Sequence, residues 1–393
     1  MPVGMCVGSE LVGSIPVNGG RFGCAGAKCT RATSKALPFK EAKVSSKKMG
    51  LRRVGIVGLS TLLATTTMMS GVASANSTFA FTRIAGVDRW ATSVATAQQF
   101  GPSTDVIVAN GENGHYPDAL TANYLAGAKH APVLLTQAAA TPANIAAQIA
   151  ASGATHVWII GGTTVVSAAQ EATLASSYTV TRLGGADRYA TAAQVMGAVT
   201  ATGHMALLAR GDNFPDAIAG GALSYAKGMP LAITQPNTLT PSTLAALQSA
   251  GTTSVLVLGG TDAISQGVVD SLAANGITLA HRFAGADRAE TSSLLADYEI
   301  TNQGFSDTAV NVASGYVNGG GADALGGSAL SGQENRPLLI TNSDIVEGAA
   351  VDAFLVKHAP TLASGFIFGG TFAISQAVED AMSAAARYLS IPG

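Results

Sequence analysis

The sequence has little cysteine. Its three cysteines, Cys6, Cys24 and Cys29, all lie near the start of a chain of 393 residues. If that region is removed, the rest of the chain has no thiols, which excludes disulfides, Cys-ligated zinc and a cysteine nucleophile. Its stability must then come from buried apolar area, which a chain with 47% apolar residues can supply.

Basic residues are scarce after residue 75. Residues 1–75 hold ten of the 22 Lys and Arg but only two of the 24 acidic residues. That leaves 12 basic and 22 acidic residues in 76–393, a formal charge of −10. Clustered positive charge is what attracts nucleic acid or anionic lipid, so we expect neither as a partner. The alternative interpretation is that the net negative charge simply keeps a surface protein soluble.

The histidines show no metal-ligand spacing and do not recur at equivalent positions of the repeats described below. We therefore expect no metal site, and nothing in the sequence predicts a cofactor. The six are His115, His130, His156, His204, His281 and His358.

The amino end has the order of a secretory signal peptide. Basic residues between 47 and 53 precede an apolar run over 54–72, and Ala73-Ser74-Ala75 follows. This order predicts cleavage after Ala75 and a mature chain that starts at Asn76, free of the membrane. A retained anchor is the alternative, because the run is long enough, but it carries six hydroxyl residues. The start codon, Met1 or Met49, stays open.

Four motifs recur three times in the same order, at spacings of about a hundred residues. The first is Arg-x-x-Gly-x-Asp-Arg and the second is Pro-Asp-Ala, weakened in the third copy. The third is an apolar run that starts with Pro and ends with Thr, and the fourth is Gly-Gly-Thr. We therefore divide the chain into an extension with the signal peptide (1–75) and three repeats (76–180, 181–280 and 281–393).

The local pattern within a repeat alternates strands with helices. Residues 106–108, 133–135 and 157–160 are short apolar runs, typical of strands covered on both faces. A helix is expected after Thr136, with Pro142 near its first turn and Ile145 and Ile149 on one face. The sequence predicts three tandem wound α/β units, each with a mainly parallel sheet. Strand order is not readable.

Taken together, these motifs resemble the cell wall binding repeat, type two, of Gram-positive bacteria, over about residues 83–393. The resemblance implies three compact α/β units in a pseudo-threefold arrangement. It also implies non-covalent attachment of surface-layer-type proteins and autolysins to anionic polymers of the wall. Such proteins usually carry a further effector domain. Here we expect none, because the repeats occupy residues 83–393.

Half of the twelve basic residues after residue 75 lie in the first motif. One interpretation makes them sites for a phosphate or carboxylate of a wall polymer, which arginine binds with two hydrogen bonds. The other pairs each of them with an aspartate of the motif, or with a neighbouring repeat, to fix a turn. The six are Arg83, Arg89, Arg182, Arg188, Arg282 and Arg288.

Asp118, Asp216 and Asp323 of the second motif fall where a strand leads into a helix. Ligands bind at that edge of an open α/β sheet, so these residues are candidate polymer contacts, with helix capping as the alternative. In the third repeat, glycines replace the Phe-Pro or Tyr-Pro, so a site there is lost or altered. The aspartates of the first motif, Asp88, Asp187 and Asp287, are predicted helix N-caps, and Gly-Gly-Thr a tight turn.

Three functions are compatible with this pattern. A binding module would attach non-covalently to an anionic wall polymer or to peptidoglycan at the cell surface. A peptidoglycan hydrolase of the amidase type and a coat-forming structural protein are the alternatives. An enzyme needs one asymmetric set of acid, base and nucleophile, whereas the polar residues here are triplicated. We therefore predict a binding protein that is not an enzyme.

Overall fold

The computed structural model of the protein describes residues 79–113, 116–315 and 321–388. The expected signal peptide, its cleavage site, the three cysteines and His115 lie outside these residues. The described residues belong to one compact unit built from three four-stranded sheets. Within each sheet every strand pairs in parallel with its neighbours. The predicted α/β class with parallel sheets is therefore confirmed.

The first sheet has the strand order β3-β2-β4-β5. Its strands are β2 (Asp105–Asn110), β3 (Val133–Thr136), β4 (His156–Ile160) and β5 (Thr179–Leu183). The helices of this part of the chain are α1 (Arg89–Phe100), the 3-10 helix η1 (Tyr116–Thr121), α2 (Ala122–Lys129), α3 (Ala143–Ala151) and α4 (Ala168–Ala175). The three apolar runs of the first repeat form β2, β3 and β4, as predicted.

The second sheet repeats this order as β7-β6-β8-β9. Its strands are β6 (Met205–Arg210), β7 (Leu231–Thr234), β8 (Ser254–Leu258) and β9 (Thr278–Phe283). The helices are α5 (Arg188–Gly197), α6 (Pro215–Ala219), α7 (Gly221–Lys227), α8 (Pro241–Ser249) and α9 (Gln266–Ala274).

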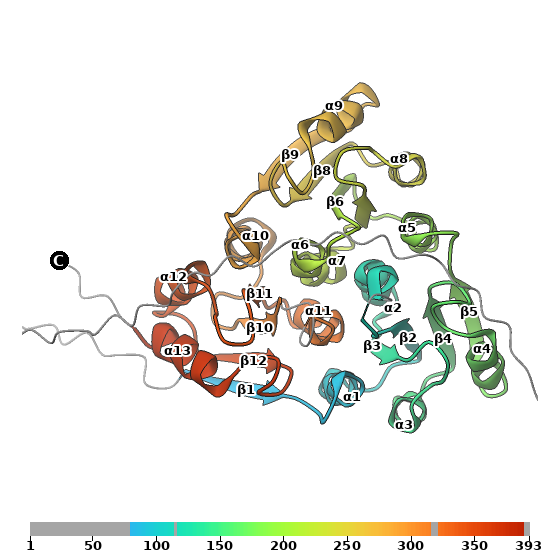
Figure 1. Ribbon diagram of the computed structural model, residues 1–393, viewed down its shortest axis with the longest axis horizontal. Helices are drawn as coiled ribbons and strands as arrows, with labels where there is room; N and C mark the ends of the chain where they lie inside the picture. Colours follow the sequence, from blue (N-terminus) through green and yellow to red (C-terminus); the bar gives the residue numbers. More distant parts are fainter. Residues whose placement is uncertain (1–78, 114–115, 316–320, 389–393) are drawn as a thin grey trace, which may run out of the picture. The chain divides into compact units, whose positions relative to one another are not determined.

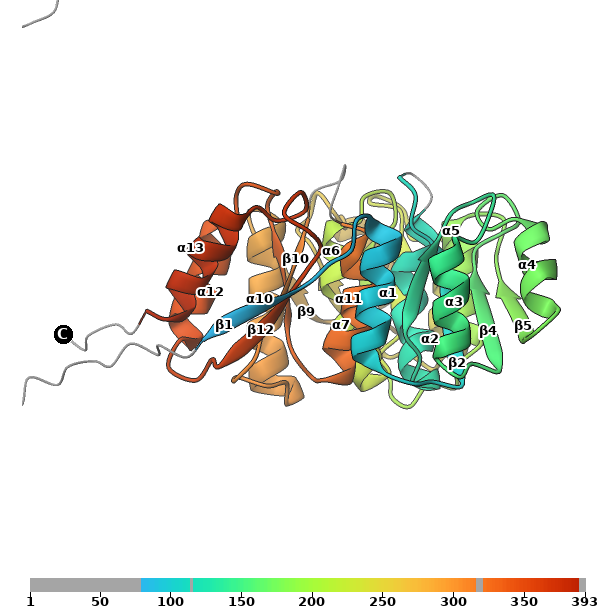
Figure 2. The ribbon, with the colours of Figure 1, turned by 90° about the horizontal axis from the view of Figure 1, so that it is seen from below.

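The third sheet takes one strand from the opposite end of the chain. Its order is β11-β10-β12-β1, with β10 (Asn311–Ser314), β11 (Leu338–Thr341), β12 (Ser364–Phe368) and β1 (Ala80–Ile84). The helices are α10 (Arg288–Gln303), α11 (Asp323–Gln333), α12 (Ala349–His358) and α13 (Gln376–Ala386). Strand β1 lies alongside β12 and thereby closes the three units into a ring (Figures 1 and 2).

Strands β1, β5 and β9 hold equivalent places at the edges of their sheets, and each carries the first arginine of the first motif. Each sheet therefore takes its last strand from the start of the next sequence repeat. As a result, β5 and β9 span the sequence divisions that we propose at 180/181 and 280/281.

Alternate residues of each strand face different cores. In β2, Ile107 and Ala109 belong to a core shared by all three units, whereas Val106 and Val108 belong to an outer core of the first sheet. The second and third sheets have outer cores of their own. Three strands of each sheet are thus covered on both faces, which explains why they read as continuous apolar runs. The edge strands β1, β5 and β9 are partly exposed and contain polar residues.

Three helices, α2, α7 and α11, pack against one another at the centre of the ring (Figure 1). Their packing is not symmetric. Tyr225 of α7 occupies the place taken by Gly127 in α2 and by Gly332 in α11, and both glycines pack closely against it. A Cβ on Gly127 would lie 2.9 Å from the backbone carbon of Tyr225 and closer still to its carbonyl oxygen. Two glycines therefore make room for one tyrosine.

Candidate binding sites between successive repeats

The second and fourth motifs meet at three equivalent places. In each unit the Pro-Asp-Ala aspartate lies against the first glycine of the Gly-Gly-Thr turn, which joins Asp118 to Gly161, Asp216 to Gly259 and Asp323 to Gly369. A Cβ on Gly161 would approach the Asp118 carboxylate to 3.0 Å, and one on Gly259 the Asp216 carboxylate to 2.6 Å. All three glycines have φ between +103° and +112°, so backbone conformation and close approach both require glycine here.

The first motif of the following repeat completes each of these places. Arg188 and Thr191 lie near Asp118, Arg288 near Asp216, and Arg89 and Thr92 near Asp323. We call these three clusters the inter-repeat sites. They are named by their aspartates, as the Asp118, Asp216 and Asp323 sites. The Asp323 site forms between the last unit and the first, so the third repeat keeps its aspartate in place despite its altered motif.

The second arginine of the first motif holds the loop that follows a central strand. Arg89 donates to the Gly111 carbonyl oxygen at 2.6 Å, Arg188 donates to that of Gly211 at 2.7 Å, and Arg288 donates to that of Gly315. In the described part of the chain, none of the three arginines forms an ion pair with a carboxylate. Each guanidinium therefore keeps donors for another partner.

Burial controls the protonation of the three aspartates. It raises the pKa of Asp118 and of Asp216, and it raises the pKa of Asp323 to about 7. Neighbouring arginines act in the opposite direction on each pKa but are outweighed. Helices α6 and α11, where Asp216 and Asp323 lie, have no side-chain cap, so neither aspartate acts as one.

The aspartates of the first motif do cap helices, as predicted. Asp88 accepts a hydrogen bond from the Ala91 amide at 2.7 Å, and Asp187 accepts one from Ala190 at 2.7 Å. Asp287 accepts the equivalent bond from Glu290 at 2.9 Å. Such caps stabilise a helix by about 1 kcal/mol.

The threonine four residues after each of these caps was not singled out in the sequence. Its hydroxyl accepts a hydrogen bond from the motif glycine, at 3.1 Å between Gly86 and Thr92 and 3.0 Å between Gly185 and Thr191. The Thr191 hydroxyl also binds Asp118 and so lowers its pKa, though by less than burial raises it. The threonine occurs at the same position in all three repeats. A closer comparison of the repeats could therefore have identified it from the sequence.

The first arginine of the motif is tied down within the protein. Arg83 pairs with Glu379 at 2.5 Å and Arg182 with Glu171 at 2.8 Å. Both also donate to the carbonyl oxygen of the Gly-Gly turn of the previous unit, at 2.8 and 2.7 Å. Arg83 and Arg182 therefore match the interpretation in which the first arginine pairs with a neighbouring repeat. Glu171 and Glu379 were not singled out in the sequence, because the second repeat has no glutamate at the equivalent position.

Arg282 is the exception, because Val269 stands where the other repeats have glutamate. Its guanidinium donates to the carbonyl oxygens of Gly259, Gly260 and Ile264, but Nη2 is buried without a partner among the described residues. Burial without a carboxylate lowers the pKa of Arg282.

We expect Val269→Glu to raise the melting temperature, because it supplies Arg282 with the carboxylate that Arg83 and Arg182 have. A hydrogen-bonded charge pair here should stabilise the fold by about 1–2 kcal/mol. In an Arg282→Gln background the same substitution buries an unpaired carboxylate and should destabilise it. Thermal unfolding of the four proteins gives the coupling free energy between the two positions, and a value near zero would contradict the pairing.

Two inter-repeat sites open into clefts. The cleft at Asp118 has a volume of 150 Å³ and the one at Asp216 a volume of 350 Å³. The larger is within the range of small-ligand pockets. At the Asp323 site, the exposed apolar residues Val87 (99% exposed) and Phe372 (95% exposed) stand where the other two sites have smaller or polar residues.

No group of three His, Cys, Asp or Glu residues within 79–113, 116–315 and 321–388 is placed to hold a metal ion. In the same residues, no helix is long and apolar enough to cross a membrane.

A closed ring of three α/β units with triplicated polar clusters at its junctions defines a tandem-repeat protein. The chain belongs to the cell wall binding domain 2 (CWB2) family, whose model matches residues 83–171, 182–269 and 282–379. The resemblance noted from the motifs is thereby confirmed, and these residues form a cell wall binding unit.

Similar proteins share this part of the chain. N-acetylmuramoyl-L-alanine amidase LytC of Bacillus subtilis (strain 168) is 27% identical over 302 residues, which is 76% of this chain and 57% of that protein. The amidase enhancer of the same organism is 28% identical over 308 residues, 77% of this chain and 40% of its own length. The chain therefore spans only about half of these relatives.

Two solved structures have the same fold. Cwp6 from Clostridium difficile has a TM-score of 0.67 at 22% identity, covering 81% of this chain and 49% of its own. Cwp8 from the same organism has a TM-score of 0.68 at 22% identity, covering 80% and 52%.

Proposed function

We propose that the protein attaches non-covalently to the cell wall by binding an anionic wall polymer in its three inter-repeat sites. The observation that carries this proposal is the threefold recurrence of a guanidinium without an ion pair beside a buried carboxyl, at the junctions of a cell wall binding fold. The arginine donates to phosphate or carboxylate groups of the polymer. The aspartate accepts hydrogen bonds from sugar hydroxyls.

The six first-motif arginines divide into two groups under this proposal. Arg89, Arg188 and Arg288 contact the polymer, together with Asp118, Asp216 and Asp323. Arg83, Arg182 and Arg282 do not contact the polymer but stabilise the sites, because they hold the Gly-Gly turn against the edge strand.

Three weak sites are enough for firm attachment to a repeating polymer. Once one site is occupied, the next binding event is intramolecular, and the avidity exceeds the affinity of a single site by about a hundredfold or more. The triplication favours this over hydrolysis, which needs one asymmetric catalytic set. The amidase activity in the name of LytC belongs to a longer protein. We further propose that the mature chain is secreted and resides at the cell surface.

Replacing Arg89, Arg188 and Arg288 together by Gln should lower the affinity for whole walls at least tenfold more than any single replacement. Lost contacts compound when sites act together. Added salt should weaken binding of the unmodified protein, since exposed charge pairs are screened over about 8–10 Å at physiological ionic strength. Sedimentation with whole walls, and with walls stripped of their anionic polymers, measures both effects.

Arg387→Gln is the matched control for charge, because Arg387 also donates to a carbonyl oxygen, that of Phe79 at 2.9 Å, outside the inter-repeat sites. It should bind walls normally. Melting temperatures show whether any variant has lost its fold. A folded triple variant that sediments like the unmodified protein, or equal binding to stripped walls, would contradict the proposal.

A further inference from the structure

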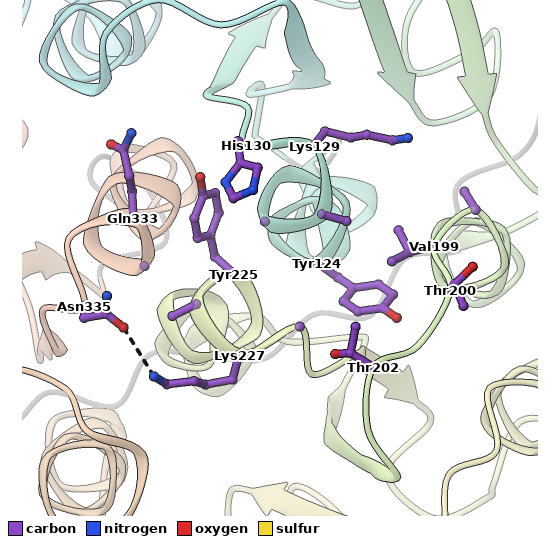
Figure 3. A pocket seen from close by; sticks show the side chains of 16 residues that line it. Tyr124, Lys129, His130, Val199, Thr200, Thr202, Tyr225, Lys227, Gln333 and Asn335 are labelled. Carbon is purple, nitrogen blue, oxygen red and sulfur yellow. Dashed lines mark hydrogen bonds between the residues drawn. The ribbon is translucent and has the colours of Figure 1, made fainter.

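The three central helices end at a large pocket. It has a volume of 860 Å³ and lies at the carboxyl ends of α2, α7 and α11, against the segment that follows α5 (Figure 3). Asp323 begins α11 and Gln333 ends it, so this pocket is about 15 Å from the Asp323 site along the helix. We call it the axial pocket.

Two buried hydroxyl groups line the axial pocket without a partner. Tyr124 is 1% exposed and Tyr225 is 7% exposed, and neither hydroxyl has a hydrogen-bond partner among the described residues. An unpartnered buried hydroxyl costs free energy that a bound ligand can recover. Burial raises the pKa of Tyr225 to about 12, so its hydroxyl stays neutral and available as a donor.

The two tyrosines serve different sides of the pocket. Figure 3 shows the Tyr124 hydroxyl directed toward Thr200 and Thr202, and the Tyr225 ring beside His130. Neither tyrosine recurs, because α11 has alanine and glycine at the two equivalent positions. The hydroxyl groups are therefore features of one site and not of the repeat pattern.

The charge of the axial pocket is positive in an otherwise acidic protein. Lys129 ends α2 and Lys227 ends α7, and no carboxylate is among the residues that line the pocket. Lys129 lies over the Trp158 ring, 4.7 Å from its centre, and Lys227 donates to the Asn335 side chain at 3.3 Å. Neither lysine is in an ion pair within the described part of the chain.

Two sources of negative charge lie near Lys129 and Lys227, but both are too weak to cancel the positive charge of the lysines. A helix carboxyl end carries about half a negative charge at most, less than the full charge of the lysine placed there. Glu299 lies near Lys227, but burial holds the pKa of Glu299 well above its usual range, which favours its neutral form. Glu334 follows the last residue of the third helix and pairs with Arg336 at 2.8 Å.

We propose that the axial pocket binds an anionic saccharide, a sugar that carries a carboxylate or phosphate group, at a site separate from the inter-repeat sites. Figure 3 shows Lys129 and Lys227 on opposite sides of the pocket, and one or the other receives the anionic group. The hydroxyls of Tyr124 and Tyr225 and the polar side chains around them bond the sugar hydroxyls. The volume is within the range of small-ligand pockets and accommodates more than one sugar ring.

Isothermal titration of the purified protein with matched soluble sugars tests this proposal without walls. N-acetylmuramic acid and N-acetylglucosamine differ by one carboxylate-bearing group, and N-acetylglucosamine 6-phosphate carries phosphate instead. We expect at least one of the two anionic sugars to bind tenfold or more tightly than the neutral one. The tighter of the two identifies the anionic group, and inorganic phosphate alone should bind more weakly than either.

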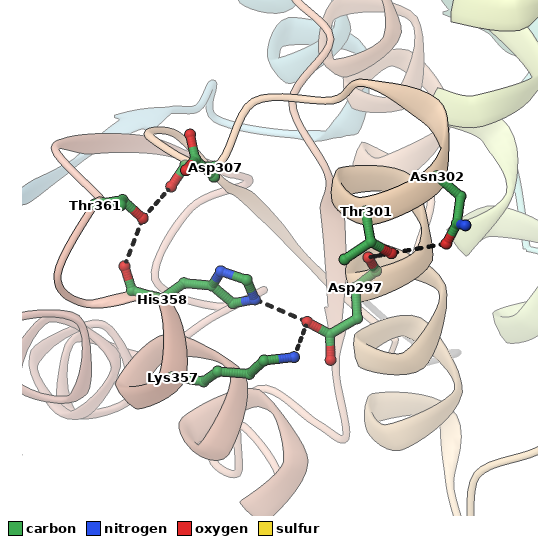
Figure 4. Close-up of polar contacts among 7 residues, drawn as sticks. All are labelled: Asp297, Thr301, Asn302, Asp307, Lys357, His358 and Thr361. Carbon is green, nitrogen blue, oxygen red and sulfur yellow. Dashed lines mark hydrogen bonds and ion pairs between the residues drawn. The ribbon is translucent and has the colours of Figure 1, made fainter.

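Lys129→Gln with Lys227→Gln should remove at least tenfold of the affinity for the preferred sugar, and Tyr124→Phe should weaken it several-fold. Lys357→Gln is the matched control, because it removes the remaining lysine of the described residues. Lys357 Nζ lies 2.8 Å from Asp297 Oδ1, which also contacts His358, in a contact between α10 and α12 that does not line the axial pocket (Figure 4).

The proposal is overturned if no sugar binds at millimolar concentration, if the neutral sugar binds as tightly as both anionic ones, or if the lysine pair and Lys357 variants behave alike. Phosphate binding as tight as the sugars would overturn the saccharide assignment. Because soluble sugars are titrated here and walls are sedimented above, either proposal can fail while the other stands.

Discussion

Asp323→Asn should make the protein more stable at pH 8 by as much as about 4 kcal/mol, with the gain shrinking as the pH falls and reaching zero only near pH 4. Burial raises the pKa of Asp323 from 3.8 to about 7. The folded state therefore binds a proton that the unfolded state has released. The contribution of this group to stability is complete below about pH 4 and is lost as the pH rises through 7. Asparagine does not titrate, so the variant escapes this loss.

Urea unfolding of the variant and the unmodified protein at several pH values between 5 and 8 measures the difference. Asp380→Asn is the control, because Asp380 is an exposed carboxylate on α13 that accepts a hydrogen bond from Gln376. This substitution removes one exposed carboxylate and leaves the buried one in place. A stability gain for Asp323→Asn that is the same at every pH would show that the carboxyl is ionised throughout.

Gly127→Ala should destabilise the protein by about 3 kcal/mol or more. The added methyl group would overlap the backbone of Tyr225, its carbonyl oxygen and carbon above all. Backbone cannot move aside as a flexible side chain can. Relief would require α2 and α7 to separate in the core that all three units share.

Gly197→Ala is the matched control, because Gly197 is also helical and a Cβ there meets nothing within 4 Å. Alanine is the better helix former, so this variant should gain about 0.5 kcal/mol. Thermal or urea unfolding of the two variants decides the point. Equal stability of the two would mean that the central helices are not packed as tightly as the geometry requires.

Local features of the fold were predictable because the sequence repeats them. Asp88, Asp187 and Asp287 cap helices, and Val106 to Val108 form a buried strand, as their chemistry dictates. The exchange of edge strands was not predictable. A parallel strand pairs with the sheet edge that lies next to it in space. The residues of β1 and β5 are equally suited to the edge of their own repeat's sheet and to that of the preceding repeat.

The candidate sites were predictable only in part. Repetition identified the arginines and aspartates, and it placed Asp118, Asp216 and Asp323 near the start of the helix that follows a strand, where they lie. It did not show that each site draws its arginine from the next repeat. Glu171 and Glu379 escaped detection because Val269 breaks their pattern, and the axial pocket escaped because its tyrosines are not repeated at all. A search for triplicate residues cannot find a site that occurs once.

The closure of the ring by β1 also decides how the protein bears mechanical load. Strand β1 runs parallel to β12 from Ala80, paired with Ser364, to Ile84, paired with Phe368. A pull on the segment before Ala80, with the body held on a wall, acts along the strand and across its hydrogen bonds. All of the bonds between β1 and β12 then resist together instead of opening one by one. Tension from that end is therefore met in shear, the direction in which a pair of strands is strongest.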